Sequence, residues 1–152
     1  MKSVVFCSSQ RFRKEMGEFV AELKRLAARK GMHPVILEPD FETRPANFEQ
    51  SHEKDRLQDT AYREAVAGRV YDHLFRKVRV ADVCFIFNKD GYLGVNTTGE
   101  LFAAAMAGKM CYALHPKALM GNYPNDLYEE PSSRKLIHEI VSTPEELLKR
   151  LA

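Results

Sequence analysis

The sequence predicts a three-layer α/β sandwich built on a parallel sheet of five strands. Short apolar runs rich in β-branched and aromatic residues alternate along the chain with stretches whose apolar residues recur at helical spacing. The clearest unit is 81–116, in which an apolar run, a glycine loop, a helix and a second apolar run follow one another. Strands joined by a crossover helix run parallel, and continuous apolar runs indicate burial on both faces.

Length and composition favour one domain over 1–152. The chain has 152 residues, of which 45% are hydrophobic, enough for a sizeable core. The 23 basic and 21 acidic residues give a net charge of +2, which argues against nucleic acid or an anionic membrane as the main partner. No apolar run is long enough to span a membrane, and the run after Lys2 is too short for a signal peptide. We therefore expect a cytoplasmic protein.

The first three elements form a strand–helix–strand unit. We expect strands at 2–7 and 33–38 and, between them, a helix that follows the turn at 8–11 and ends at Gly31. The first strand is followed by neither a GxGxxG loop nor a Walker loop, so the fingerprints of dinucleotide binding and of nucleoside triphosphatases are absent.

The turn after the first strand is a candidate phosphate site. Ser8 and Ser9 offer hydroxyl groups, Arg11 offers a guanidinium, and the start of a helix favours negative charge. A second interpretation stays open, because serines before a helix often cap its first N–H groups without binding a ligand.

The next segment, 39–56, is polar, contains two prolines and shows no periodicity. It is predicted to be a long loop, either a lid in which Phe41 and Phe48 close over a ligand or a mobile connection. A helix is predicted over 57–80, with one apolar face in the core. His73 on this helix is expected to be structural or exposed.

Two carboxylates flank the loop that follows the third strand. Asp90 stands at the carboxyl tip of the strand 83–87, and Glu100 lies where the next helix opens, a position that favours its ionised form. Paired carboxylates are typical of glycosidic-bond chemistry. The neighbouring residues that we expect to contact a ligand are Gly91, Tyr92, Gly94 and Thr98.

Glu100 has a second interpretation, as part of a helix cap. Thr97 and Glu100 have the spacing of a capping box, in which the glutamate accepts a hydrogen bond from the N–H of the cap residue. Capping boxes are common and nucleophilic glutamates are rare, so the spacing alone favours the cap.

The chain after the fourth strand, 110–114, is predicted to be irregular over 115–133, a second candidate lid in which Tyr123 and Tyr128 offer faces for stacking. A last strand at 136–141 and a capped helix from Thr143 complete the predicted fold.

The three cysteines are predicted to be buried and unbridged. Cys7, Cys84 and Cys111 each lie inside a predicted strand and form no CxxC pair. Their spacing argues against a metal or redox role.

The stretch around Glu100 resembles the nucleoside 2-deoxyribosyltransferase superfamily, including its relatives that hydrolyse the N-glycosidic bond of deoxynucleoside 5′-monophosphates. The family pattern is similar to Asp90-Gly91, Gly94 to Thr98, Glu100, the alanines at 103–105, and Gly108-Lys109. Weaker matches are Ala81-Asp82 and Cys7-Ser8-Ser9, and the family usually has a glycine at the position of Phe102.

The resemblance implies a flavodoxin-like, Rossmann-like sheet in the order 2-1-3-4-5. It implies that Glu100 attacks the anomeric carbon of a nucleoside or nucleotide and that Asp90 assists the leaving base, with no cofactor and no metal. It also implies a homo-oligomer, a dimer or larger, in which a neighbouring subunit completes the pocket. A non-catalytic nucleotide or nucleotide-sugar binding module is the alternative, because fold does not decide function.

Overall fold

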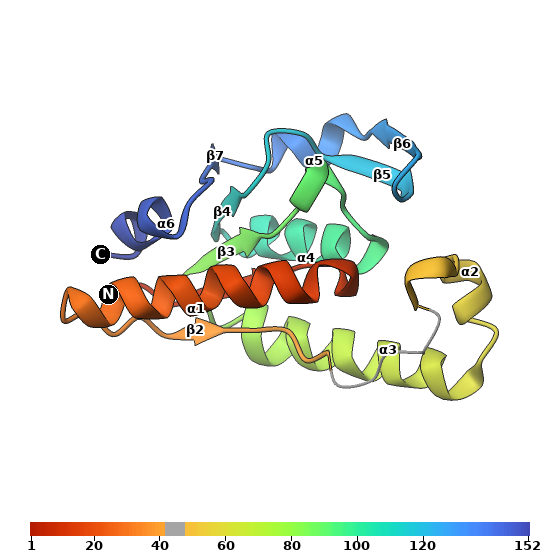
Figure 1. The fold of residues 1–152 in the computed structure, drawn as a ribbon, viewed down its shortest axis with the longest axis horizontal. Helices are drawn as coiled ribbons and strands as arrows, with labels where there is room; N and C mark the ends of the chain where they lie inside the picture. Colours follow the sequence, from red (N-terminus) through yellow and green to blue (C-terminus); the bar gives the residue numbers. More distant parts are fainter. Residues whose placement is uncertain (42–47) are drawn as a thin grey trace.

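The computed structural model describes residues 1–41 and 48–152 and has the predicted α/β architecture (Figure 1). Within these residues, five parallel strands form one sheet in the order β2-β1-β3-β4-β7. The strands are β1 (Val4–Cys7), β2 (Ile36–Leu37), β3 (Val83–Ile86), β4 (Met110–Ala113) and β7 (Glu139–Ile140). The predicted order 2-1-3-4-5 is confirmed, with β7 as the fifth strand.

Helices pack on both faces of this sheet (Figure 1). One face carries α1 (Arg13–Arg29) and α6 (Pro144–Leu151), and the other carries α4 (Val95–Met106) and the π-helix Leu74–Val78 that continues α3 (Thr60–His73). The shorter helices are α2 (Glu53–Arg56) and α5 (Pro131–Lys135), with 3-10 turns at Gln10–Phe12, Phe48–Gln50 and Lys89–Gly91. No helix in the described part of the chain is both long and apolar enough to cross a membrane.

β1 contributes to the apolar core on each side of the sheet. All four of its residues are buried. Val4 and Phe6 pack on the side of α1, whereas Val5 and Cys7 pack on the side of α4, because successive strand residues point to opposite faces. The helices meet the sheet with apolar residues at helical spacing, and those of α1 are Met16, Val20, Leu23 and Ala27.

The three cysteines are buried and free, as predicted. They come from the neighbouring strands β1, β3 and β4 and lie on the face that α4 covers. The sulfur atoms of Cys7 and Cys84 are 3.7 Å apart. Cys111, one strand further, directs its thiol to the Lys109 carbonyl at 3.6 Å.

The segment 115–133, predicted to be irregular, contains a hairpin. β5 (Leu119–Asn122) pairs with β6 (Asp126–Glu129) in antiparallel register, outside the main sheet. The prediction failed because the hairpin is mostly exposed and lacks the apolar alternation that marks a half-buried strand. Gly121 allows the close pairing, since a Cβ there would lie 2.3 Å from the Asp126 carbonyl oxygen.

The helix predicted over 57–80 begins later and buries less than expected. Asp59 caps it at Thr60. Only the end of the predicted apolar face joins the core, where Val78 is buried and Leu74 packs beside it, because the first turns of α3 lie toward α2 and away from the sheet (Figure 1). Phe75, for example, is 39% exposed, whereas His73 is buried.

The predicted loop 39–56 is partly helical, with a 3-10 turn at Phe48–Gln50 and then α2. Its central part, 42–47, lies outside the described residues. Phe48 is buried, and the half-buried Phe41 packs against the core cluster that contains α1.

Asp82 joins the start of β3 to the start of β1. Its carboxylate accepts hydrogen bonds from the backbone N–H of Ser3 at 2.7 Å and from the Ser3 hydroxyl at 2.8 Å. The Asp82 N–H donates in turn to the Ser3 hydroxyl oxygen at 3.0 Å. The backbone hydrogen bond from Ser3 is the main reason why the pKa of Asp82 is lowered.

Replacing Asp82 should destabilise the fold in a pH-dependent way. Since the folded-state pKa is lowered, the contribution of Asp82 is present above its unfolded pKa of about 3.9 and is lost as the pH falls through the folded-state pKa. We therefore expect Asp82→Ala to lower the melting temperature at pH 7 and to differ less from wild type in acid. Thermal unfolding across pH measures this, with the exposed Asp72→Ala as control. If the melting temperature of Asp82→Ala stayed below that of wild type by the same amount down to acid pH, the role of the carboxylate would be contradicted.

Candidate active site

β1 and β3 end level with each other, so the chain leaving each strand reaches the same edge of the sheet. The Phe87 N–H donates to the Cys7 carbonyl at 2.9 Å, and the Ser8 hydroxyl donates to the Phe87 carbonyl at 3.3 Å. The turn at 8–11 therefore lies beside the loop that starts at Asn88. This is the carboxyl edge of a parallel sheet, where ligands bind in open α/β folds.

In the turn at 8–11, both serine hydroxyls form hydrogen bonds with backbone groups. The Ser9 hydroxyl accepts a hydrogen bond from the Arg11 N–H at 3.3 Å and caps the 3-10 turn that opens α1. The Arg11 guanidinium donates to the Ser51 carbonyl at 3.3 Å and lies over the Phe48 ring at 5.4 Å. The capping interpretation thus describes Ser9, and Arg11 is held by groups of the protein.

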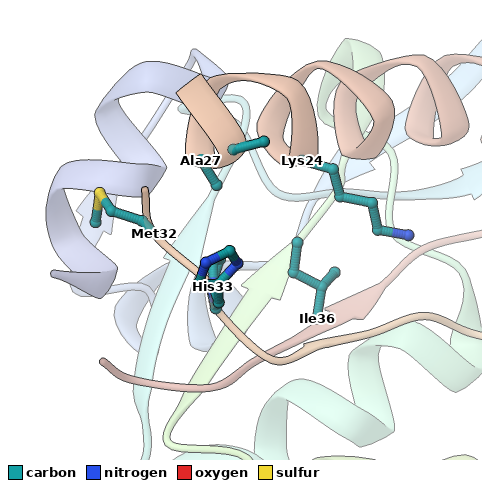
Figure 2. A pocket seen from close by; sticks show the side chains of 7 residues that line it. Lys24, Ala27, Met32, His33 and Ile36 are labelled. Carbon is teal, nitrogen blue, oxygen red and sulfur yellow. The ribbon is translucent and has the colours of Figure 1, made fainter. Parts of the chain in front are cut away.

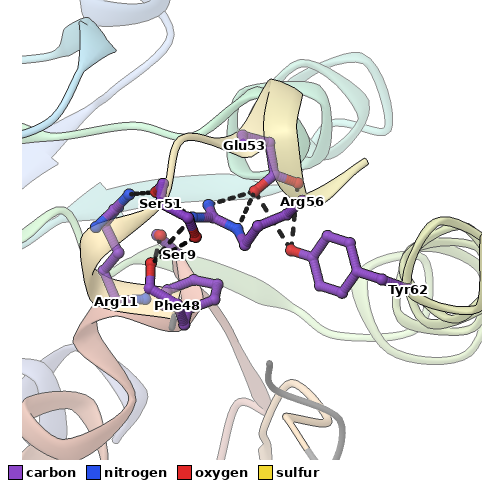
Figure 3. A network of polar contacts seen from close by, with 7 residues as sticks. All are labelled: Ser9, Arg11, Phe48, Ser51, Glu53, Arg56 and Tyr62. Carbon is purple, nitrogen blue, oxygen red and sulfur yellow. Dashed lines mark hydrogen bonds and ion pairs between the residues drawn. The ribbon is translucent and has the colours of Figure 1, made fainter. Parts of the chain in front are cut away.

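A buried arginine fixes the segment that covers this turn (Figure 3). The Arg56 side chain donates to Glu53 at 3.1 Å, to the Phe48 carbonyl at 3.0 Å and to the Ser51 hydroxyl at 3.1 Å. Its guanidinium also stacks 4.1 Å from the centre of the Phe48 ring. The Tyr62 hydroxyl donates to the same Glu53 carboxylate at 3.3 Å. Residues 48–62 therefore form an ordered rim beside Arg11.

Asp90 stands exposed at the tip of the loop after β3. It adopts a left-handed backbone conformation with φ 57°, which aspartate tolerates better than most residues. The Tyr123 hydroxyl donates to it at 2.9 Å and Lys89 lies 3.2 Å away, and the hydrogen bond from Tyr123 is the first cause of its lowered pKa. Gly91 follows with φ 84°, where a Cβ would lie 3.0 Å from that of Lys117. Gly91 is thus required by the backbone.

Aromatic rings line the space between the two loops. The half-buried Tyr92 packs edge-on to Phe12 with ring centroids 6.1 Å apart and contacts Tyr123 at 5.2 Å. The Arg11 guanidinium lies 5.5 Å from the Tyr123 ring centre. Tyr123, predicted only as a stacking face on a lid, belongs to this cluster.

Asn88 ties the end of β3 to the chain that leaves β4. Its side chain is fully buried and donates to the His115 carbonyl at 3.0 Å and to the Lys117 carbonyl at 2.8 Å. Its amide oxygen accepts from the His115 N–H at 3.0 Å. One side chain therefore satisfies three backbone groups beneath the Asp90 loop.

The capping box predicted for Thr97 and Glu100 is not formed. α4 begins earlier, at Val95, with Gly94 as its first flanking residue and no side-chain cap. The Thr98 hydroxyl donates to the Gly94 carbonyl at 2.9 Å inside the first turn. Glu100 consequently lies in the second turn, beyond the reach of the cap N–H.

Glu100 is instead buried against β1 and α3. Its carboxylate oxygen Oε2 lies 3.6 Å from Nε2 of His73, and the same nitrogen lies 3.5 Å from the Cys7 sulfur. The three side chains come from three different elements and expose 7%, 4% and 0% of their residue surface for Glu100, His73 and Cys7.

Burial decides the protonation of this cluster. It raises the pKa of Glu100 to about 7, with the Cys7 thiol lowering it less, and it lowers the pKa of His73 to about 4. His73 is therefore neutral at pH 7, and its contact with Glu100 is not an ion pair. Desolvation therefore outweighs the expected effect of the helix start, and about half of the Glu100 carboxyl groups are ionised at pH 7.

The predicted pair of carboxylates is divided between two environments. Asp90 is exposed with Tyr123 and Lys89 as partners, whereas Glu100 is buried with Cys7 and His73. Phe102, at the position of the family glycine, is 42% exposed on α4 and does not share the burial of Glu100.

A solved structure shares this fold, and two others are similar at TM-scores below 0.5. A conserved protein from Enterococcus faecalis V583 has 16% sequence identity and a TM-score of 0.54, with 99% of this chain and 97% of that one covered. A 2-deoxyribosyltransferase from Bacillus psychrosaccharolyticus has 17% sequence identity and a TM-score of 0.49, with 96% of this chain and 90% of that one covered. A CMP N-glycosidase, BcmB, from Clostridium botulinum has 14% sequence identity and a TM-score of 0.43, with 98% of this chain and 97% of that one covered. No family model and no curated protein matches the sequence.

A separate hollow lies at the opposite edge of the sheet (Figure 2). It has a volume of about 370 Å³ and is lined by Lys24, Ala27, Ala28, Met32, His33, Pro34 and Ile36. These residues belong to the end of α1 and the approach to β2, which is the amino edge. None of the predicted site residues lines it.

Two members of the buried cluster were missed as site residues by sequence reasoning. Cys7 was assigned to the core, and His73 was treated as structural or exposed. The available signal was the place of Cys7, the last residue of a strand directly before Ser8. No comparable signal marks His73, because its burial depends on the packing of the end of α3 near Cys7.

Replacing Asn88 should destabilise the loops of this edge. We expect Asn88→Ala to cost about 2 kcal/mol or more in the free energy of unfolding, because three buried backbone groups lose their partner. Urea unfolding measures the cost. Asn96→Ala, at an exposed position on α4, is the matched control and should change stability by no more than about 0.5 kcal/mol. Equal stabilities for the two variants would contradict the role of Asn88.

Proposed function

We propose that this protein cleaves or transfers the N-glycosidic bond of a nucleoside or a nucleoside 5′-monophosphate, with Glu100 as the nucleophile. The observation that carries the proposal is the place of Glu100. It is a buried carboxyl group that caps no helix and lies below the carboxyl edge of the sheet, in contact distance of a histidine. Burying such a group costs free energy, and buried carboxyls are common where a function requires them. The resemblance of the 90–109 stretch supports the same assignment.

The chemistry assigns a separate task to each carboxylate. Ionised Glu100 attacks the anomeric carbon, the bond to the base breaks, and water or a second base then displaces Glu100 from the sugar, so that configuration is retained. Asp90, ionised because of its lowered pKa, assists by orienting the base through a hydrogen bond from a base N–H, and the departing base takes its proton from water. No metal or cofactor takes part in these steps.

The remaining predicted residues are proposed as substrate contacts. Ser8, Ser9 and Arg11 lie at the start of the α1 turn, where a 5′-phosphate would exchange with their present hydrogen bonds. The loop residues proposed to border the sugar and base are Gly91, Tyr92, Gly94 and Thr98.

We further propose that residues 1–152 form one domain, that the protein resides in the cytoplasm and that it assembles as a homo-oligomer. The helix α4 carries large exposed apolar side chains, with Val95 at 77% and Met106 at 88%, and this surface is where contact between copies is expected. Light scattering of the purified protein measures the state of assembly.

The substitution Glu100→Gln tests the proposed nucleophile. Glutamine has nearly the same shape, so the fold should persist, but an amide is a much poorer nucleophile. Base release should fall roughly a thousandfold or more, equivalent to about 4 kcal/mol of barrier. The measurement incubates a panel of nucleosides and nucleoside monophosphates with the protein and follows the free base by chromatography.

Glu146→Gln is the matched control, because Glu146 is a helix-start glutamate that forms a capping box on α6. It should retain the base release of wild type. If the rate of base release by Glu100→Gln stayed within about threefold of wild type, Glu100 would not be the nucleophile. If wild-type protein bound a nucleoside or nucleotide without releasing base, the non-catalytic binding module would be favoured.

A further inference from the structure

Three side chains of metal-binding type point their ligand atoms at one buried point. The Cys7 sulfur, the His73 imidazole nitrogen and a Glu100 carboxylate oxygen all lie within 4.8 Å of one another. The sequence gives no hint of this group, because its members are separated by 66 and 27 positions and share no motif. The fold alone brings them together.

Each ligand is placed by a different element. Cys7 is the last residue of β1. His73 is the last residue of α3, where the α-helix passes into the π-helix Leu74–Val78, a change of winding that alters the direction of side chains and often accompanies functional sites. Glu100 comes from the second turn of α4.

Two of the three ligand separations match a tetrahedral zinc centre. With bonds of about 2.3 Å to sulfur and about 2.0 Å to nitrogen or oxygen, tetrahedral angles set sulfur and nitrogen about 3.5 Å apart and nitrogen and oxygen about 3.3 Å apart. The observed separations are 3.5 Å for Cys7 and His73 and 3.6 Å for His73 and Glu100. Rotation of the Glu100 carboxyl group adjusts the third separation, which is at most 4.8 Å.

We propose that Cys7, His73 and Glu100 form a binding site for Zn²⁺, with Cys7 Sγ, His73 Nε2 and a Glu100 carboxylate oxygen as ligands and the fourth position open to water. A thiolate and an imidazole select zinc over magnesium and calcium, which prefer oxygen ligands. Binding forms the Zn–S, Zn–N and Zn–O bonds in exchange for water ligands of the ion, and it releases to solvent the thiol proton and, where Glu100 is protonated, the carboxyl proton. One thiolate and one carboxylate then neutralise the dication, so the filled site places no net charge in the core.

This site goes beyond the proposed function and shares one residue with it. A zinc ion bound to Glu100 occupies the carboxylate that would attack the sugar. The metal-loaded protein should therefore release no base until a chelator removes the ion. Metal binding is measured without nucleoside, so the test of the zinc site does not depend on whether the protein cleaves a glycosidic bond.

Cobalt is the probe for the test. The full chain is purified, treated with chelator and titrated with Co²⁺, which should bind with one ion per chain. The expected spectrum has the visible bands of tetrahedral cobalt and a near-ultraviolet charge-transfer band from thiolate, and both should disappear when Zn²⁺ is added.

Substitutions assign the ligands. Cys7→Ser should remove the charge-transfer band, and His73→Asn should weaken Co²⁺ binding by more than the roughly 10–100-fold that loss of an outer partner costs. Cys111→Ser is the matched control, since Cys111 is buried on the same face outside the trio, and it should keep the band. Circular dichroism checks that each variant is folded.

Two results would overturn the site. One is folded wild-type protein that develops no thiolate band with Co²⁺, an outcome that requires no variant. The other is a band that survives in Cys7→Ser or is lost in folded Cys111→Ser. Should base release still depend on Glu100 in either case, only the zinc site falls and the proposed function stands.

Discussion

The pairing of β1 with β3 is the constraint on which the candidate site depends. The register runs from Val4 beside Val83 to Cys7 beside Ile86, so the two strands end level. Hydrogen bonds join the two strands at both ends, from the Ser3 N–H to the Asp82 carboxylate at one end and from the Phe87 N–H to the Cys7 carbonyl at the other. A shift of one residue would turn Cys7 to the opposite face, away from α4. The cluster around Glu100 would then lose its member from β1.

The Glu100 carboxyl group lies among apolar side chains in the layer between the sheet and α4. Leu101, adjacent to Glu100, and Ile86, paired with Cys7, are fully buried apolar residues of the same layer. A carboxyl group in such surroundings loses its hydration, which is why the pKa of Glu100 rises to about 7. An apolar residue at this position would pack without that cost. A carboxyl group buried at this cost is consistent with the role proposed for Glu100, and the fold places it at the sheet edge.

The strands and the place of Asp90 followed from local pattern, whereas the strand order was implied by the family resemblance. Buried parallel strands leave continuous apolar runs, and Asp90 stands directly after one of them. The burial of His73 did not follow, since it depends on the tertiary packing of the end of α3 near Cys7. The capping box failed for a local reason: α4 starts at Val95 after Gly94, so Glu100 is carried into the second turn. The exposed hairpin of 115–133 left no apolar alternation to detect.

Trapping of the glycosyl intermediate tests the central claim, that Glu100 bonds to the sugar. A 2-fluoro analogue of the substrate that the protein cleaves would slow release of the sugar from the enzyme, because fluorine destabilises the oxocarbenium-like transition state. Peptide mass spectrometry should then find the mass of the fluorinated sugar on the peptide that contains Glu100 and on no other. Base release without any such mass, or the sugar on a different residue, would contradict the account.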